Sequence, residues 1–405
     1  MLSILTSHPI QYQVPLWRTI TARGLDAQVW FLTNHGLKNA LDREFGVQFA
    51  WDVELLGGYE HDFLSLHQPV DMSRFRGVRL KEELGSRLKS VRATHLWVEG
   101  WRYQAFWQAI KAAKKEGVRI VLRGETNALG RRGVAKRVAR QLILRPLLAK
   151  VDAFLCIGTQ NRRFYEQYGI ATNRMFTAPY CVDNDYFVSA AERLRPERAR
   201  LRLKWGIADD AVVVLFCGKF IEKKHPMHLV EAARLLVPDC PRLHLLFVGG
   251  GDQGRQLREN VSVVHDSELG ACRSDSIRSG MPRASFAGFL NQSQIPEAYA
   301  VADMLVLPSD HGETWGLVVN EAMASGIPAI VSDQVGCAVD LPQVLDPKFV
   351  YRFGDIEGLR RAIQHCDKSH FSRDAVRVVA GRCHLMHTVC AIETVLYGQS
   401  DALRG

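Results

Sequence analysis

The stretch Leu307–Asp333, LPSDHGETWGLVVNEAMASGIPAIVSD, places polar side chains between a predicted strand and a predicted helix. An apolar run ends at Leu307, a polar loop follows, and Gly316 opens the helix. Free N–H groups and the positive dipole end at the start of that helix would bind an anion. Glu313 in the loop and Glu321 in the helix would then accept hydrogen bonds from hydroxyl groups of a sugar or a ribose. The alternative is a solvated acidic pair on a surface helix.

A second stretch, Val212–Ala233 (VVVLFCGKFIEKKHPMHLVEAA), places lysines directly after a predicted strand. Gly218 and Lys219 follow the strand, and Lys223 and Lys224 precede the next helix. Open α/β sheets bind ligands at the carboxyl ends of their strands, where lysine ammonium groups can meet phosphate. The stretch is interpreted as a phosphate site, with a solvated lysine pair as the alternative.

These residues need a scaffold of parallel α/β units, and the hydrophobic pattern predicts one. Short β-branched apolar runs alternate with longer amphipathic stretches. The apolar runs predict strands at Ser3–Leu5, Ala27–Leu32, His95–Val98, Arg119–Leu122, Ala153–Ile157, Val212–Phe216, Leu243–Val248, Met304–Leu307 and Ala329–Val331. The amphipathic stretches predict helices at Gln104–Lys115, Pro226–Leu236, Glu297–Ala302 and Gly316–Ser325.

A polar, charged break near Pro179–Pro196 divides this pattern into two similar α/β domains. We expect domains at 1–185 and 186–380, followed by a terminal helix at 381–405 that returns toward the first domain. The stretch His265–Pro282 is polar and poorly periodic, which predicts a surface loop.

The composition of the 405-residue chain is that of a globular protein, with 47% hydrophobic and 23% charged residues. No run approaches the ~20 apolar residues of a membrane span, and the N-terminus shows no signal-peptide pattern. Nine cysteines without a C-x-x-C pair indicate reduced thiols in the cytosol. The net charge of +9 favours anionic partners such as phosphorylated substrates, nucleic acid or a membrane surface.

The ordered motifs of residues 179–335 resemble those of the family-4 retaining glycosyltransferases of the GT-B type. That family's pattern combines a Gly-Arg turn and a lysine, a V-G-x-G strand end, an F-x-G strand, a P-S-x(n)-E-x-F-G loop and E-A-x-A-x-G-x-P. Lys219, His225 and Trp315 depart from it, because Arg, Gly and Phe are usual there. The matching segments are Gly218–Lys219 with Lys224, Phe247–Gly251, Phe286–Gly288, Pro308–Ser309, Glu313–Gly316, Glu321–Pro328 and the domain-joining segment Pro179–Phe187.

The resemblance implies a GT-B fold, in which two Rossmann-like parallel α/β domains face each other across a cleft. It implies transfer of a sugar from a nucleotide-diphosphate donor to a glycan or lipid-linked acceptor in cell-envelope polysaccharide synthesis. Retention at the anomeric carbon, without a metal or other cofactor, is implied as well. Lys219, Lys224 and Glu313 would be catalytic. Donor-binding residues would be Gly218, Gly249, Gly250, Gly288, Leu290, Thr314, Trp315, Gly316, Leu317, Val318 and Glu321.

Two alternatives stay open beside this interpretation. The first is another enzyme on the same fold, such as a nucleotide-sugar epimerase or a phosphorylase. The second is a non-catalytic basic adaptor that binds anionic lipid or nucleic acid. The combination of Lys219, Lys224, Glu313 and Glu321 argues against an adaptor, and no nucleic-acid partner is expected.

Acceptor-side candidates lie in the first half of the chain. The first predicted strand runs into His8, and similar His-Pro-Ile-Gln-Tyr openings occur in some members of the family. Glu99 ends one strand, and Arg123 and Glu125 follow another, so these side chains lie where open sheets bind ligands. A structural Arg–Glu pair between the loops is the alternative.

Three further patterns resemble known cofactor or metal motifs, and none is interpreted as such a site. Gly249–Gly254 satisfies G-x-G-x-x-G but does not begin a domain, so a phosphate-facing turn is preferred to a dinucleotide site. Asp183 and Asp185 imitate the D-x-D metal pair of another glycosyltransferase class, but they lie in the domain connector. Cys383, His387 and Cys390 share a helical face, and three ligands without a second cluster favour a buried face over a zinc site.

The segment 130–150, GRRGVAKRVARQLILRPLLAK, is basic and contains no acidic residue. Val134, Val138 and Leu142 share one face of the predicted helix, as in helices that lie on an anionic leaflet. We therefore expect a cytoplasmic protein that can contact the inner face of the cell membrane. The alternative is an ordinary domain helix whose apolar face packs on the sheet.

Overall fold

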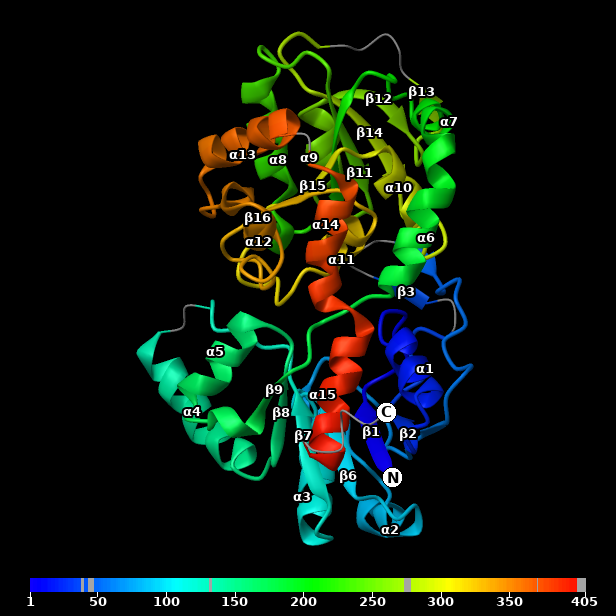
Figure 1. Cartoon of the computed structure of the whole chain (residues 1–405), viewed down its shortest axis with the longest axis vertical. Helices are drawn as coiled ribbons and strands as arrows, with labels where there is room; N and C mark the ends of the chain where they lie inside the picture. The colour runs from blue at the N-terminus through cyan, green and yellow to red at the C-terminus, as the bar shows by residue number, and fades with distance from the viewer. Residues whose placement is uncertain (38–39, 43–46, 131–132, 273–277, 370, 399–405) are drawn as a thin grey trace. The chain divides into compact units, whose positions relative to one another are not determined.

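The computed structural model describes residues 1–37, 40–42, 47–130, 133–272, 278–369 and 371–398 (Figure 1). The chain forms two compact units. Unit 1 comprises residues 1–38, 54–180 and 385–405, and unit 2 comprises residues 39–53 and 181–384. The first unit thus ends five residues before the expected boundary at 185. Segment 39–53, which we expected in the first domain, groups with unit 2.

Unit 1 is built on a seven-stranded sheet with the strand order β5-β2-β1-β6-β7-β8-β9. All neighbouring strands pair in parallel. The chain starts at β1 in the interior of the sheet and builds outward in both directions, which makes the β1–β6 border a topological switch point. The strands are β1 (Leu2–Thr6), β2 (Ala27–Phe31), β5 (His61–Phe63), β6 (His95–Glu99), β7 (Arg119–Arg123), β8 (Ala153–Cys156) and β9 (Met175–Thr177).

Helices cover both faces of this sheet because successive strand residues point to opposite sides. In β6, Leu96 and Val98 join a buried core with Phe106 of α3, whereas Trp97 packs edge-on against Trp17 of α1. The helices of unit 1 are α1 (Val14–Ala22), α2 (Leu84–Ser90), α3 (Gln104–Lys115), α4 (Val134–Leu148), α5 (Thr159–Gln167) and α15 (Leu385–Tyr397), with short 3-10 turns at Phe75–Gly77 and Thr172–Arg174.

The C-terminal helix α15 packs on α1, β8 and β9. Thr388 donates to the carbonyl of Pro179 at 2.9 Å, and Glu393 pairs with Arg23 of α1 at 3.3 Å. The last helix of the chain therefore completes the first unit.

Unit 2 contains an eight-stranded sheet with the order β13-β12-β14-β11-β10-β15-β16-β17. Every pair is parallel except β12 with β13. Its first strand, β10, again lies in the interior, so the β10–β15 border is a second switch point. The strands are β10 (Val212–Cys217), β11 (Leu243–Val248), β12 (Ser262–Asp266), β13 (Ala271–Cys272), β14 (Arg283–Gly288), β15 (Met304–Leu307), β16 (Ala329–Ser332) and β17 (Val350–Tyr351).

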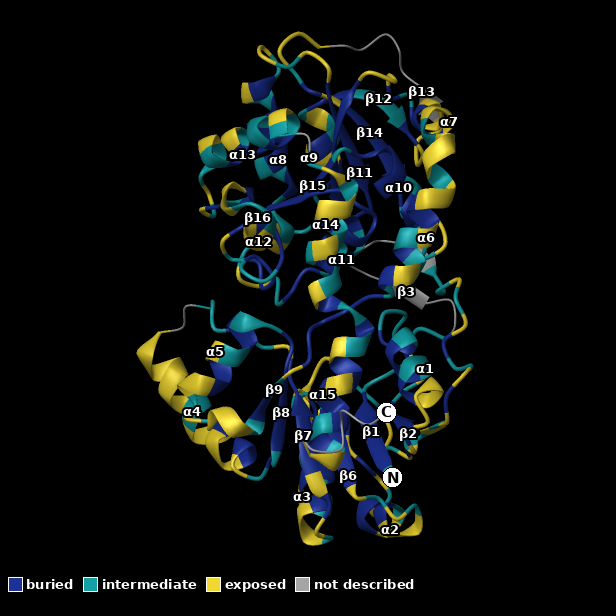
Figure 2. Ribbon diagram, in the orientation of Figure 1, coloured by how far each residue is buried: buried dark blue, intermediate teal, exposed yellow. Residues whose placement is uncertain are grey.

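Figure 2 shows the central strands of both units buried between helices that expose their outer faces. A separate two-stranded hairpin, β3 (Ala40–Asp42) with β4 (Val47–Phe49), also belongs to unit 2. The helices of unit 2 are α6 (Asn184–Leu194), α7 (Arg198–Lys204), α8 (Pro226–Leu236), α9 (Gly254–Glu259), α10 (Ile295–Val301), α11 (Leu317–Ala324), α12 (Pro342–Leu345), α13 (Ile356–Ser369) and α14 (Arg373–Ala380), with 3-10 turns at Arg195–Glu197, Glu222–Lys224, Pro347–Phe349 and Gly381–Cys383.

The predicted elements agree with the structure to within about one or two residues at each end, the usual spread of such boundaries. Helices α3 and α8 and strands β11 and β15 have the predicted bounds. The expected loop 265–282 contains the end of β12 and the short β13, and its residues 273–277 lie outside the described part.

Candidate functional site

The predicted donor residues of unit 2 lie at the carboxyl ends of β10, β11, β14 and β15, and β10 and β15 are the two strands of the switch point. Lys219 and Lys224 lie in the loop after β10, and Glu313 lies in the loop after β15. The two loops are joined because the amide of Asp310 donates to the carbonyl of Lys223 at 3.0 Å. A crevice at such a border is where open α/β sheets bind ligands.

Lys224 and Glu313 form an ion pair across this border, with the ammonium donating to the carboxylate. Each side chain is 14% exposed, so the pair is largely shielded from water. Shielding from water strengthens such a charge–charge contact relative to a fully solvated pair. The arrangement holds a cation and an anion side by side. The cation suits a phosphate, and the anion suits a neighbouring group that carries hydroxyls.

The 3-10 turn that carries Lys224 is closed by His225 in the left-handed conformation, with φ of 46°. A side chain costs about 1–2 kcal/mol in this conformation, which explains why glycine is usual here in the related family. The His225 ring stacks on His228 at 4.8 Å, and its Nε2 lies 3.6 Å from Asp310. These contacts offset part of the backbone strain.

The glycines after β10 and β11 allow the two loops to meet backbone to backbone. Gly218 and Gly249 have φ of 143° and 121°, and a Cβ on Gly249 would lie 2.1 Å from the carbonyl oxygen of Gly218. The amide of Phe220 donates to the carbonyl of buried Gly250 at 2.7 Å. The glycine run is therefore required by close packing within the site.

The loop after β14 lies next to this turn. The carbonyl of Gly288 accepts a 2.8 Å hydrogen bond from the amide of Gly249. Half-buried Leu290 follows, between Phe289, which packs on Phe49 at 4.3 Å, and Asn291, which donates to the carbonyl of Ala50 at 2.7 Å. The segment 47–53 thus covers part of this loop.

Helix α11 starts at the same edge, with Gly316 as its N-cap at φ of 103°. Leu317 and Val318 form the first turn and are half-buried, so their backbone N–H groups begin the helix beside Glu313 and Thr314. Trp315 differs from expectation in one respect. Its side chain is 2% exposed and donates from Nε1 to Asn320 at 2.8 Å, so the ring holds the start of the helix in place within the protein.

Glu321 lies in α11 and accepts a 2.6 Å hydrogen bond from the hydroxyl of Tyr299 in α10. Burial raises the pKa of Glu321 to about 7, although the Tyr299 hydrogen bond favours the ionised form. Tyr299 was not among the predicted site residues. Only the packing of α10 against the sheet brings its hydroxyl to Glu321, and a single tyrosine in an apolar helix carries no sequence signal.

Unit 1 has a cavity of about 320 Å³ at its own switch point, next to the carboxyl ends of β1, β6 and β7. His8, Glu99 and Glu125, three of the four acceptor-side candidates, line it. Tyr12 lines it as well and was not predicted, although it belongs to the same His-Pro-Ile-Gln-Tyr segment. The cavity is large enough to hold a sugar-sized group.

Arg123, the fourth candidate, lies beside the cavity wall and is 2% exposed. It pairs with Glu99 at 3.9 Å, donates to the carbonyl of Pro179 at 3.3 Å and lies over the ring of Tyr180 at 4.9 Å. Burial raises the pKa of Glu99 to about 8, with Arg123 acting in the opposite direction. This geometry supports a structural and electrostatic role for Arg123.

The cavity groups are joined by short hydrogen bonds. The hydroxyl of Tyr180 donates to Glu125 and forms a 2.8 Å hydrogen bond with the hydroxyl of Tyr12. His8 shares a 2.8 Å hydrogen bond with Ser7, and burial lowers the pKa of His8 to about 4. A neutral imidazole and carboxyl groups in one cavity can accept hydrogen bonds from hydroxyl groups.

The aspartate pair and the Cys383, His387 and Cys390 pattern lie outside both sites. Asp183 caps α6 by accepting from the amide of Tyr186 at 3.0 Å. Asp185 lies 3.6 Å from His384 and is largely exposed. Cys383 is buried and Cys390 is exposed, and the described residues contain no cluster of three or more His, Cys, Asp or Glu side chains suited to a metal ion.

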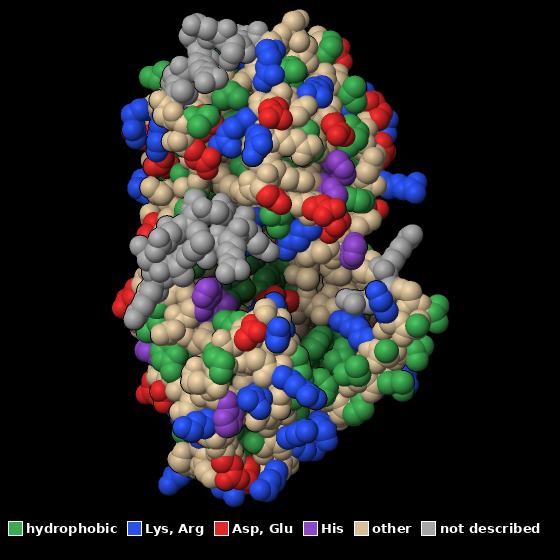
Figure 3. Space-filling model, turned by 180° about the vertical axis from the view of Figure 1, so that it is seen from behind, with side chains coloured by type: hydrophobic (Ala, Val, Ile, Leu, Met, Phe, Trp, Pro, Cys, Tyr) green, Lys and Arg blue, Asp and Glu red, His purple; other side chains and the backbone are tan. Residues whose placement is uncertain are grey.

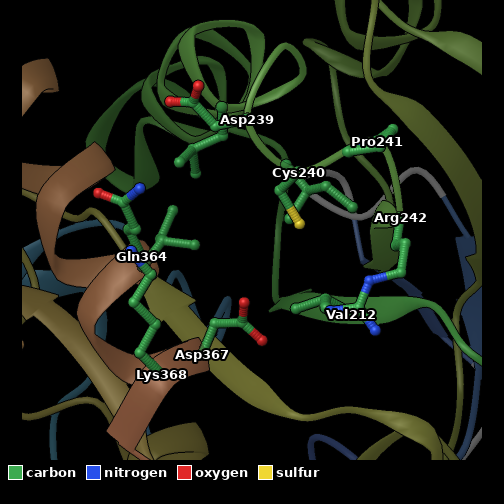
Figure 4. Close-up of a pocket in the computed structure, with 11 residues that line it drawn as sticks. Val212, Asp239, Cys240, Pro241, Arg242, Gln364, Asp367 and Lys368 are labelled. Atoms are coloured by element: carbon green, nitrogen blue, oxygen red, sulfur yellow. The ribbon is translucent and has the colours of Figure 1, made fainter.

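Unit 2 has a second cavity of about 500 Å³, shown in Figure 4. Its lining residues come from the amino ends of β10 and β11 and from α13, among them Cys240, Arg242 and Asp367. This is the end of the sheet opposite the switch-point loops. Parallel sheets place ligands at the carboxyl ends of their strands, so this cavity does not extend the predicted donor site.

Comparison with known proteins identifies a family for the segment that contains the predicted donor-binding residues. Residues 211–367 match the family model described as Glycosyl transferases group 1. The resemblance to glycosyltransferases is thereby confirmed for this segment, which contains every predicted donor-side residue.

The relatives and the fold neighbours are glycosyltransferases. A D-inositol 3-phosphate glycosyltransferase of Geodermatophilus obscurus is 27% identical over 274 residues, which cover 65% of this chain and 57% of that protein. A sulfoquinovosyl transferase of Arabidopsis thaliana, SQD2, is 29% identical over 178 residues, covering 44% of this chain and 30% of that one. The chain spans less than two thirds of either relative.

Solved structures match almost the whole chain. A glycosyltransferase from Rickettsia africae aligns with a TM-score of 0.67 and 14% identity, covering 100% of this chain and 99% of that one. Anabaena Alr3699/HepE in complex with UDP-glucose aligns with a TM-score of 0.62 and 15% identity, covering 98% and 99%. The expected α/β class of GT-B type is confirmed. Among the described residues, no helix is long and apolar enough to cross a membrane.

Proposed function

We propose that this chain transfers a sugar from a nucleoside-diphosphate donor to a hydroxyl group of an acceptor, as a retaining enzyme of glycosyltransferase family 4. The observation that carries the proposal is the Lys224–Glu313 pair at the switch point of unit 2, within the segment that matches the glycosyltransferase family. The UDP-glucose bound to the Anabaena neighbour supports a nucleotide sugar as donor.

Each donor contact follows from the charge and position of a group in unit 2. Lys219 and Lys224 neutralise the departing diphosphate, and the amides of Leu317 and Val318 add the positive end of α11. Glu321 accepts hydrogen bonds from the ribose hydroxyls, and Glu313 from the sugar hydroxyls. With these lysines and backbone amides in place, the reaction needs no metal ion to hold the diphosphate.

The acceptor hydroxyl binds in the cavity of unit 1, where Glu125 and His8 orient it. In the transfer step the bond from the anomeric carbon to the diphosphate oxygen breaks, and a bond to the acceptor oxygen forms on the same face. The acceptor proton passes to the departing diphosphate. Atoms and charges balance, and the product keeps the configuration of the donor.

The acceptor class in this proposal is a glycan or a lipid-linked saccharide of the cell envelope, and the place of action is the cytoplasmic face of a membrane. The exposed basic helix α4 supports contact with an anionic lipid surface. Each basic residue close to such a surface contributes about 1 kcal/mol of attraction.

A two-step experiment tests the proposal. Nucleotides and nucleotide sugars are first screened for a rise in melting temperature, because a ligand that binds only the folded state stabilises it. The stabilising nucleotide sugar is then incubated with membrane-lipid and oligosaccharide extracts, with and without chelator, and free nucleotide is measured. Release that depends on an acceptor and resists chelator is expected. Conversion of the nucleotide sugar without release of nucleotide would identify an epimerase, and the absence of any stabilising nucleotide would exclude the donor site.

A further inference from the structure

The amino-terminal half of α4 presents an apolar row to solvent. Val134, Val138 and Leu142 follow one another at intervals of four residues, so they share one face of the helix. They are 67%, 47% and 71% exposed, and the adjoining Ile143 is 59% exposed. The expected alternative, in which this face packs on the sheet, is therefore wrong. Figure 2 shows this helix largely exposed along its length.

The carboxyl-terminal half of the same helix is anchored in unit 1. Leu144, Leu147 and Leu148 are buried in its core. Arg140 lies over the ring of Phe164 at 4.9 Å and donates to Thr126 at 3.4 Å. The exposed row is thus held on a fixed helix, and its apolar surface is part of the folded unit.

The charged side chains of α4, which flank the apolar row, are all basic. Lys136, Arg137 and Arg145 are exposed on α4, and the helix contains no acidic residue. Figure 3 shows hydrophobic and basic side chains side by side on this part of the surface, at the right of the view. An apolar stripe flanked by cations complements a leaflet with anionic head groups and a hydrocarbon interior.

A cavity of about 750 Å³ opens beside the row, because Ile143 and Leu144 of α4 form one of its walls. Its described lining residues include four cations and no acidic side chain. None of these cations forms an ion pair with a described residue, and aromatic rings lie between them. The cations are Arg76, Arg79, Arg102 and Lys111, and the rings are those of Phe75, Trp101 and Trp107.

The aromatic wall is fixed by its own contacts. Trp107 donates from Nε1 to the carbonyl of Trp101 at 2.9 Å and meets Phe75 edge-on at 5.8 Å. Trp101 stacks on Phe164 at 5.9 Å, the ring over which Arg140 of α4 lies. Cations and aromatic rings held in one cavity suit a ligand that joins an anionic group to an apolar chain.

We propose that this cavity binds the phosphate-bearing head group of a membrane lipid, with the exposed row of α4 inserted into the same leaflet. Trp101 and Arg102 line both this cavity and the acceptor cavity that contains His8, Glu99 and Glu125. A lipid held by its phosphate in the first cavity can therefore reach the second with an attached saccharide. The inference rests on the proposed glycosyl transfer and narrows its acceptor to a lipid phosphate or diphosphate.

Flotation of the full chain with vesicles tests the site without any donor. Vesicles of phosphatidylcholine with phosphatidylglycerol should carry the protein upward at low salt, and vesicles of phosphatidylcholine alone should not. The double variant Arg79→Gln/Lys111→Gln should bind on the order of 25-fold more weakly, because each basic residue near an anionic surface is worth about fivefold. The matched control Lys114→Gln/Lys115→Gln removes the same charge from exposed positions of α3 that do not line the cavity.

A second pair of variants tests the apolar row. Val138→Ser/Leu142→Ser should weaken vesicle binding by about tenfold, since two exposed apolar side chains lose their contact with the hydrocarbon. Leu203→Ser/Val378→Ser is the control, because these side chains are 78% and 75% exposed in unit 2. Both variants change only exposed residues and should keep the wild-type melting temperature.

Three results would overturn the inference. The first is no flotation of wild type at low salt. The second is an equal loss of binding in the cavity variant and in its α3 control. It would show that vesicle binding depends on the net charge of the protein and not on the cavity. The third is a melting-temperature rise with inorganic pyrophosphate that depends on Arg79 and Lys111 while vesicles fail to bind, which would assign the cavity to a water-soluble phosphate. The variant Lys224→Ala should float like wild type, so a failure of glycosyl transfer is recognised separately.

Discussion

Lys224 and Glu313 are 89 residues apart in the chain and form an ion pair across the border of β10 and β15. Each neutralises the other in the absence of donor. A donor diphosphate would compete with Glu313 for the ammonium group, so the pair controls how strongly the site attracts anions.

Replacing Glu313 with Gln should tighten nucleoside-diphosphate binding several-fold while slowing glycosyl transfer. The variant keeps the size of the side chain but removes the anion that competes for Lys224. Lys224→Ala should weaken binding of the diphosphate and reduce turnover by about 100-fold, as for the loss of one charge contact in a transition state. Calorimetric titration with UDP and with other nucleoside diphosphates measures the first effect. Equal affinities in wild type and Glu313→Gln would mean that the pair is not at the phosphate position.

Glu321 should make both stability and ribose binding depend on pH. Because its folded pKa is raised from 4.5 to about 7, the protonated form favours the folded state. The stabilisation is complete below about pH 4.5, falls as the pH rises toward 7 and is lost above it, a change of about 3 kcal/mol. The melting temperature of Glu321→Gln should therefore depend less on pH over this range than that of wild type.

Ionisation of Glu321 should affect nucleotide affinity in the opposite direction to stability. As the pH rises, the affinity increases while the stability decreases. The ionised carboxylate accepts hydrogen bonds from two ribose hydroxyls, whereas the protonated acid accepts fewer. UDP affinity should rise from about pH 6 to pH 8 in wild type, and the rise should disappear in Glu321→Gln. A 2′-deoxyribose nucleotide serves as control, since it should show a smaller rise. An unchanged pH profile in the variant would remove Glu321 from the ribose position.

Above about pH 8, where the Glu99 carboxyl group is ionised, Arg123→Met should destabilise unit 1 by about 3–5 kcal/mol, because it leaves the buried carboxylate without its cation. Adding Glu99→Gln to this variant should recover part of the loss, since the uncompensated carboxylate is then removed. Urea unfolding of the two single variants and the double variant measures the coupling. Additive losses would show that the two side chains act independently.

Gly249→Ala should lower stability and nucleotide binding together. The added Cβ would lie 2.1 Å from the carbonyl oxygen of Gly218, and φ of 121° disfavours alanine in any case. We expect a loss of at least about 2 kcal/mol. The control is Gly381→Ala, where φ is −58° for a residue that starts a 3-10 turn and a Cβ would meet open space. If both variants unfold at the same temperature, the close contact of the two loops is not required.

The sequence by itself determined the elements and the residue types in the loops between them. Alternation of apolar runs placed α3, α8, β11 and β15, because hydrophobic periodicity is a local property. Gly218, Lys224 and Glu313 could be predicted as site residues because motif spacing after a strand needs no knowledge of strand order. Glu99 and Glu125 were predicted from the rule that ligands gather at strand carboxyl ends, and His8 from the opening segment after the first strand. The structure brings the three side chains into one cavity.

The tertiary structure alone decided which of these loops meet and which faces stay uncovered. Strand order sets the switch points, and it depends on non-local pairing that periodicity does not encode. The contact of Tyr299 with Glu321 depends on how α10 packs, and the inward position of the Trp315 ring depends on Asn320. The hydrophobic pattern of an amphipathic helix is the same whether its apolar face packs on a sheet or faces solvent. Only the packing of α4 through Leu144, Leu147 and Leu148 left Val134, Val138 and Leu142 exposed.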